Sequence, residues 1–240
     1  MDPNAYKLIA NTKNAILDAN GVLYFQDTRS VTTERQENAK TLAAVIQSLK
    51  KSVFGYRSFV ELLTYAYYNW FPDYFFITPA SSTGKYHPAF ANKENGLVLH
   101  SFAVVKYTEV LMNIVNAHTD AYRDPMIYNQ MICAAWFHDM FKYGDPANYK
   151  PGVYTDHGHP VYAADFFLHP DVIKICYDLG IKEDIIRNIS DLIRTHMGPY
   201  TTNKYSNIVL ESPKTPQQTL LYTADFLASR KETDVVKNLL

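Results

Sequence analysis

The 240-residue sequence lacks the features that mark several classes of protein. It has two cysteines, Cys133 and Cys176, each within an apolar stretch and not paired as CxxC, so we expect buried free thiols in a reducing compartment and no disulfide framework. Its net charge is −1, so the chain lacks the excess of basic residues that is typical of proteins that bind long nucleic acid. No charged region followed by an apolar segment opens the chain, and no apolar run approaches the ~18 residues of a membrane span. A cytoplasmic protein with no membrane partner is therefore predicted.

Apolar residues recur mostly at helical spacing, which predicts an all-α fold. No strand pattern stands out, and residues 74–77 are a weak candidate. Two stretches, 79–96 and 201–214, are expected to be loops, and a loop as long as the first is often functional. The expected helices cover residues 4–19, 33–51, 59–71, 97–117, 124–144, a short segment from 159, 171–179, 183–197 and a final segment from 215 past 225.

Several histidines and aspartates fall where these helices should face the interior. His100 shares an apolar stripe with Val104, and His138 and Asp139 end the apolar run that begins at Met131. A lone inward histidine is usually a satisfied core residue, but buried carboxylates are costly without a partner. A divalent cation would hold such a set, and mixed nitrogen and oxygen ligands suit Mn, Fe, Co, Ni or Zn, with Mg as a further option. The remaining candidates of this kind are His159, His196 and Asp225.

The order His100, His138-Asp139, Asp225 resembles the H…HD…D signature of the HD-domain metal-dependent phosphohydrolases. Lys142 matches the lysine of HD-x-x-K, although Phe141 replaces the small residue often found before it. Further segments resemble the family's motifs in the same order: NGLVLHS, HPVYAADFF, IRTHMG and TADFLASR. The resemblance implies an HD-domain helical bundle over residues 79–240. Residues 1–78 would then be an N-terminal helical extension, serving in packing or in a homo-oligomer contact.

The resemblance also implies a ligand set. In the family, His100, His138, Asp139 and Asp225 would bind one metal ion. The added histidines, His159 and His196, resemble the two-metal branches, in which Asp139 would bridge both ions. One ion, with these two histidines as hydrogen-bonding support, is the alternative. His157 competes with His159 within DHGH, but the following Pro160 favours His159.

The family's chemistry predicts hydrolysis of a phosphate ester or anhydride of a small nucleotide, whether a mono-, tri- or cyclic phosphate, by metal-bound hydroxide. Asp139 and Lys142 would be the catalytic residues, with Lys142 on a phosphate oxygen; a solvated lysine is the alternative. The loop that holds Lys85 and Tyr86 resembles a region of HD-type 3′-to-5′ exoribonucleases, which suggests substrate contacts, although a structural flap explains it equally well. An exonuclease on short single strands and a non-catalytic nucleotide sensor are the competing functions.

Overall fold

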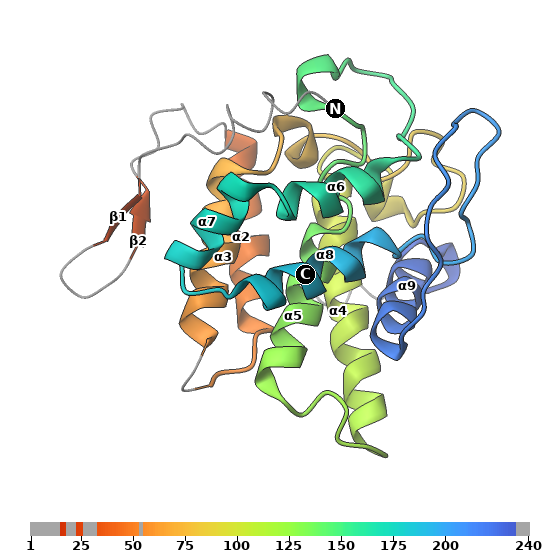
Figure 1. The fold of residues 1–240 in the computed structure, drawn as a ribbon. Helices are drawn as coiled ribbons and strands as arrows, with labels where there is room; N and C mark the ends of the chain where they lie inside the picture. The colour runs from red at the N-terminus through yellow and green to blue at the C-terminus, as the bar shows by residue number, and fades with distance from the viewer. Residues whose placement is uncertain (1–14, 18–22, 26–32, 53–54, 234–240) are drawn as a thin grey trace.

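The computed structural model describes residues 15–17, 23–25, 33–52 and 55–233, and over them the fold is all-α, as predicted. The central helices are α4 (Gly96–Asn116) and α5 (Pro125–Phe137), which pack together, and α9 (Pro216–Ala228) lies against α4 (Figure 1). A second layer is formed by α6 (His159–Phe167) on α8 (Glu183–Arg194), and α8 contacts α5. The short α7 (Pro170–Asp178) flanks α8.

The first helices of the described chain share this core. Two of them, α2 (Thr33–Gln47) and α3 (Tyr56–Asn69), pack on α4 and α5 respectively. Trp70, just after α3, meets Phe166 of α6 edge to face at 5.3 Å between ring centroids, and Phe71 stacks on Phe137 at 5.6 Å. The boundary at residue 78 stays a prediction, but one cluster of buried apolar side chains extends across it.

The predicted helix over residues 4–19 is wrong where the structure describes it. Residues Ala15–Leu17 form strand β1, which pairs antiparallel with β2 (Leu23–Phe25), with Ile16 opposite Tyr24. Aromatic and β-branched residues such as Ile16 and Tyr24 favour such strands. The residues between the two strands lie outside the described part of the chain. The rest of the 4–19 range lies outside the described residues. Residues 74–77, the weak strand candidate, lie mostly in the 3-10 helix Asp73–Phe76.

Several helices end earlier than predicted. Helix α2 stops at Gln47, not near 51, and α3 stops at Asn69, not at 71. Helix α5 stops at Phe137, not near 144, and α8 stops at Arg194, not at 197. Beyond α5 the chain continues through tight turns, in which the Lys142 amide donates to the Asp139 carbonyl at 3.0 Å. His138 and His196 therefore lie at helix ends and not within helices.

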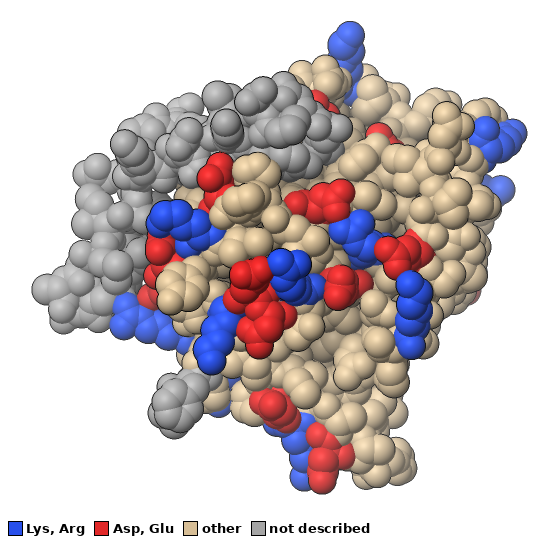
Figure 2. Space-filling model, viewed as in Figure 1, with Lys and Arg blue, Asp and Glu red and all other residues tan. Residues whose placement is uncertain are grey.

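The predicted loops are confirmed, with short additions. Residues 79–96 contain the 3-10 turn Ala89–Ala91 before α4 begins, and residues 201–214 hold no regular element. Two further 3-10 turns cover Pro146–Asn148 and Lys231–Thr233. On the face drawn in Figure 2, acidic and basic side chains of the described residues are interspersed. In α7, Lys174 Nζ lies 2.7 Å from Asp178 Oδ2.

Helix α4 is the one helix in the described part of the chain that is long and apolar enough to span a membrane by length and composition. Half of its most apolar 18-residue window is buried within the fold. Its apolar character suits its position, since it contacts α2, α5 and α9. Cys133 and Cys176 are both buried and free, as expected.

Candidate metal centre

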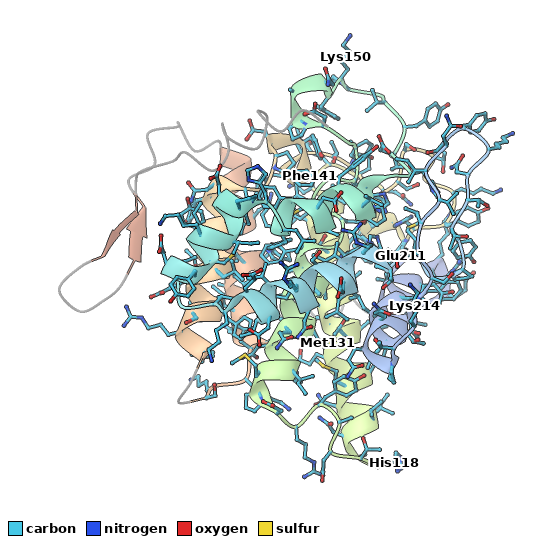
Figure 3. All side chains as sticks on the ribbon, in the orientation of Figure 1. His118, Met131, Phe141, Lys150, Glu211 and Lys214 are labelled. Atoms are coloured by element: carbon cyan, nitrogen blue, oxygen red, sulfur yellow. The ribbon has the colours of Figure 1, made fainter. Side chains whose placement is uncertain are left out.

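The six predicted ligand residues meet in one buried cluster. They come from α4, from the turn after α5, from the start of α6, from the turn after α8 and from α9, and each is less than one-tenth exposed. His118, by contrast, is exposed just beyond the far end of α4 (Figure 3). The cluster consists of His100, His138, Asp139, His159, His196 and Asp225.

Three of the histidines are oriented by the same kind of hydrogen bond, from the ring to a main-chain carbonyl. His138 Nδ1 lies 2.7 Å from the Ala135 carbonyl, His196 Nδ1 lies 2.7 Å from the Ile193 carbonyl, and His159 Nδ1 lies 2.5 Å from the Asp156 carbonyl. Each acceptor is three residues earlier in the chain. A carbonyl can only accept, so Nδ1 donates and the neutral ring carries its lone pair on Nε2. All three Nε2 atoms face the interior of the cluster, ready to bind a cation.

Asp139 stands between two groups of ligands. Its Oδ2 lies 3.4 Å from His100 Nε2 and 3.3 Å from His138 Nε2. Asp225 Oδ1 closes this first group, at 3.0 Å from His100 Nε2.

The second group is on the other carboxylate oxygen. Asp139 Oδ1 lies 3.0 Å from His159 Nε2 and 3.5 Å from His196 Nε2. The two imidazole Nε2 atoms are 3.1 Å apart. If both rings carry their protons on Nδ1, two lone pairs face each other at this distance, which is unfavourable unless a cation or a proton lies between them.

These residues fit a metal ion. Two atoms that each lie about 2.1 Å from the same tetrahedral or octahedral ion are roughly 3.0–3.4 Å apart, close to the distances in both groups. Nε2 of His100 and of His138 is buried without hydrogen-bond geometry to any partner in the described structure, despite the nearby carboxylates. Unsatisfied buried nitrogens beside carboxylates are the donor set of a transition-metal site. The cluster could therefore hold a metal ion.

Burial and neighbouring charges set the protonation of the cluster. Burial lowers the pKa of His138, and burial together with the Lys142 charge lowers the pKa of His159 to about 4. Burial also acts to raise the pKa of Asp139, but the Lys142 ammonium and His138 hold it well below its usual range. For His100, burial is outweighed by the carboxylates of Asp139 and Asp225, which raise its pKa. The carboxylates are thus charged and at least two imidazoles are neutral near pH 7.

Lys142 lies closer to Asp139 than the sequence suggested. A helix through residue 144 would place Lys142 one turn beyond His138, but the turn brings its Nζ to 3.0 and 2.9 Å from the two Asp139 oxygens. The ammonium is largely buried, and it supplies the positive charge nearest to Asp139.

His87 is a neighbour of the cluster that the sequence did not single out. Its ring packs edge to face on His100 at 5.0 Å between centroids, and its Nε2 is 3.4 Å from Ser229 Oγ. Burial and the neighbouring His100 lower its pKa to about 3. The sequence offers one indication of this position: His87 lies in the long loop at residues 79–96, and loops of that length are often functional.

Two residues of the same loop, predicted to bind substrate, lie at its exposed rim. Lys85 Nζ is 5.1 Å from the centroid of the Tyr86 ring, and the Arg230 guanidinium approaches that ring at 5.7 Å. Neither Lys85 nor Tyr86 belongs to the metal cluster. His157, the competitor of His159, directs its Nε2 to the Thr201 carbonyl at 3.3 Å and is not a member of the cluster either.

Comparison of the chain with protein-family models, with curated proteins and with solved structures finds no match. The geometry alone supports an all-α bundle with a buried histidine and aspartate cluster that could hold a metal ion.

Proposed function

We propose that the chain is a metal-dependent phosphohydrolase of the HD type, acting on a phosphate ester or anhydride of a small nucleotide. The observation that supports this most strongly is the position of Asp139, whose Oδ2 lies near His100 and His138 and whose Oδ1 lies near His159 and His196. The two sides adjoin, since the ligand atoms of His138, His196 and Asp225 also lie within 4.8 Å of one another. The ligands follow the H…HD…H…H…D order of the family that the sequence resembles. A carboxylate shared in this way would hold two ions at a short, fixed separation.

Each residue then has a role that its contacts suit. Divalent ions at this cluster would activate a water molecule and stabilise charge on a phosphate group. Asp139 would fix the two binding positions, and His159 and His196 would complete the second. Lys142, whose ammonium lies beside Asp139, would donate to a phosphate oxygen as negative charge develops there. Solvent reaches the cluster at the side chains of Lys142 and Asp225, which are 11% and 13% exposed, so substrate would enter on that side.

The test combines metal analysis with a substrate panel. The purified chain would be assayed for bound metal, then for release of phosphate or nucleoside with Mn²⁺ from mono-, tri- and cyclic nucleotides and from short oligonucleotides. We expect bound transition metal and turnover of a small nucleotide, with both abolished in Asp139→Ala. His118→Ala, an exposed histidine far from the cluster, is the matched control and should behave as the wild type.

The other outcomes discriminate between the functions. Absence of metal and of turnover in the wild type would overturn the enzyme proposal. Cleavage of oligonucleotides alone would favour the exonuclease, for which the Tyr86 ring at the rim offers a stacking surface. Metal and nucleotide binding without turnover would favour a sensor.

A further inference from the structure

A large groove lies beside the metal cluster, and the proposed phosphate chemistry does not use it. Its volume is about 960 Å³, within the usual size range of small-molecule sites. We call it the tyrosine groove, since four tyrosines line it. Its lining residues belong to three loops and the start of α6: Ser82, Thr83, Tyr143, Gly144, Asp145, Asn148, Val153, Tyr154, Thr155, Asp156, His157, Tyr162, Asn203, Tyr205 and Ser206.

The groove and the metal cluster share a wall at Asp156. The Asp156 amide donates to the Lys142 carbonyl at 2.8 Å, and its carbonyl accepts from His159 Nδ1 at 2.5 Å. Its side chain lines the groove. Asp156 thus separates the groove from His159, which it contacts at Nδ1, and from the main chain of Lys142, so the groove adjoins the cluster without sharing a lining residue with it.

Hydrogen bonds between the loops give the groove a defined shape. The Thr155 amide donates to Ser82 Oγ at 3.4 Å, which links the loop before α4 to the segment before α6. His157 Nε2 donates to the Thr201 carbonyl at 3.3 Å and links that segment to the loop between α8 and α9. The three loops gather at one end of the bundle, at the upper right of Figure 1.

The chemistry of the lining argues against a phosphate and for an uncharged ring. Two carboxylates, Asp145 and Asp156, line the groove, and among the described residues that line it there is no lysine or arginine. Figure 2 shows mostly uncharged residues over this part of the surface, with basic side chains at its upper and right edges. At the edge of the groove, Lys204 Nζ lies 4.5 Å from the centroid of the Tyr205 ring. The two carboxylates disfavour a phosphate inside the groove, whereas the tyrosine rings offer stacking surfaces. Asp145 already accepts hydrogen bonds at both of its oxygens, and Asp156 Oδ1 accepts from the Gly158 amide at 2.7 Å, so Asp156 Oδ2 is the oxygen that would accept from a hydroxyl or amino group.

We propose that the tyrosine groove binds the uncharged part of the substrate, a nucleoside whose base stacks on tyrosine and whose hydroxyl or amino groups donate to Asp156, while its phosphate lies at the metal cluster. This rests on the proposed phosphohydrolase function. It deepens that function by assigning the place at which the nucleoside part of the same small-nucleotide substrate binds.

The first test uses Tyr154→Ala and Tyr205→Ala, at residues that are 78% and 84% exposed, so the variants should fold. We expect the KM for the nucleotide identified in the panel to rise roughly tenfold in each, with kcat within about twofold of the wild type, because stacking is lost but the reacting centre is kept. Tyr177→Ala removes a tyrosine on α7 that is similarly exposed, at 72%, and should change neither value. An unchanged KM in both groove variants would overturn the inference.

A second measurement separates this inference from the proposed function. The wild-type chain, treated with a chelator to remove metal, would be titrated with adenosine, guanosine, cytidine and uridine and with inorganic phosphate, followed by NMR or calorimetry. Binding of at least one nucleoside that is weakened in Tyr205→Ala supports the groove even if no phosphatase activity is found. Phosphatase activity in the wild type with no nucleoside binding, or with binding unchanged in Tyr205→Ala, would overturn the groove and leave the enzyme proposal intact.

Discussion

Asp139 has no exposed surface, and its two oxygens lie within 3.5 Å of nitrogens from four histidines and Lys142. The sequence could predict the members of this cluster, because the order of His and Asp residues along the chain resembles that of a known family. It could not predict that Lys142 would pair with Asp139, since that contact depends on a turn where a helix was expected. Nor could it predict His87, because the contact of a loop residue with α4 is a tertiary feature.

The number of ions can be tested at His196. If each side of Asp139 holds one ion, His196→Ala should lower the metal-to-chain ratio from about two to about one, since it leaves the His100 side complete. Metal content after gel filtration, measured by mass spectrometry, is the readout. His157→Ala should keep the wild-type ratio, because His157 faces the Thr201 carbonyl. A wild-type ratio near one that His196→Ala does not change would mean that a single ion is bound.

The metal-free chain should lose stability as the pH falls from about 6.5 to about 4. In this window the unfolded chain protonates His87, His138 and His159, whereas the folded chain, in which their pKa values are lowered, to about 3 for His87 and about 4 for His159, resists protonation. Each such group contributes a slope of up to about 1.4 kcal/mol per pH unit. The urea midpoint of chelator-treated protein at pH 7, 6 and 5 is the measurement.

The pKa shifts of Asp139 and His100 change the stability outside the range from pH 6.5 to pH 4. The depressed pKa of Asp139 stabilises the fold above the usual carboxyl pKa of 3.8, and that contribution is lost only at lower pH. His100, with its raised pKa, stabilises the fold below 6.5 and loses that contribution as the pH rises through its folded pKa. His159→Gln should flatten the decline between pH 6.5 and 4. A midpoint that stays constant or rises as the pH falls would contradict the assignment of neutral, buried imidazoles.

At the scale of elements, most helices could be predicted from apolar spacing and caps, as for α9, where Thr215 and Gln218 form a capping box. The ends of α5 and α8 could not be predicted in this way, because the imidazoles of His138 and His196 compete with main-chain amides for the carbonyl oxygens there. In a longer α5 the Ala135 carbonyl would accept from the Asp139 amide, but the His138 ring donates to it instead. The Ile193 carbonyl receives the amide and the ring of His196 in the same way.

The turn after α8 depends on close packing against α9. Gly198 has a φ of +62°, and a Cβ there would lie 2.2 Å from the Tyr222 ring. Gly198→Ala should therefore lower the free energy of unfolding by roughly 1–3 kcal/mol through overlap and backbone strain. Urea denaturation of the single and double variants measures it. In a Tyr222→Ala background the cost of Gly198→Ala should shrink to the backbone part alone, and equal costs in both backgrounds would show that the ring is not the obstacle.

For the whole molecule, the shared core predicts one cooperative unfolding transition. The two tryptophans report on different parts: Trp70 follows α3 and contacts α6, whereas Trp136 lies in α5. Trp70→Phe and Trp136→Phe each leave one fluorophore. The fluorescence transition of each variant should coincide with its own transition in circular dichroism. If the remaining Trp70 reported a separate, earlier transition, residues before 79 would form an independent unit.

The hydrogen bonds that orient three of the imidazoles have a consequence for which substitutions the chain tolerates. The acceptors of His138, His159 and His196 are main-chain carbonyls, so the side chains at 135, 156 and 193 do not form these bonds. Substitutions at these positions that preserve the local backbone should keep the rings in place. Ala135 and Ile193 are fully buried and Asp156 lines the tyrosine groove, so the same substitutions would act on packing or on the groove. Mutational scans of these positions would therefore overlook how the ring orientation is set.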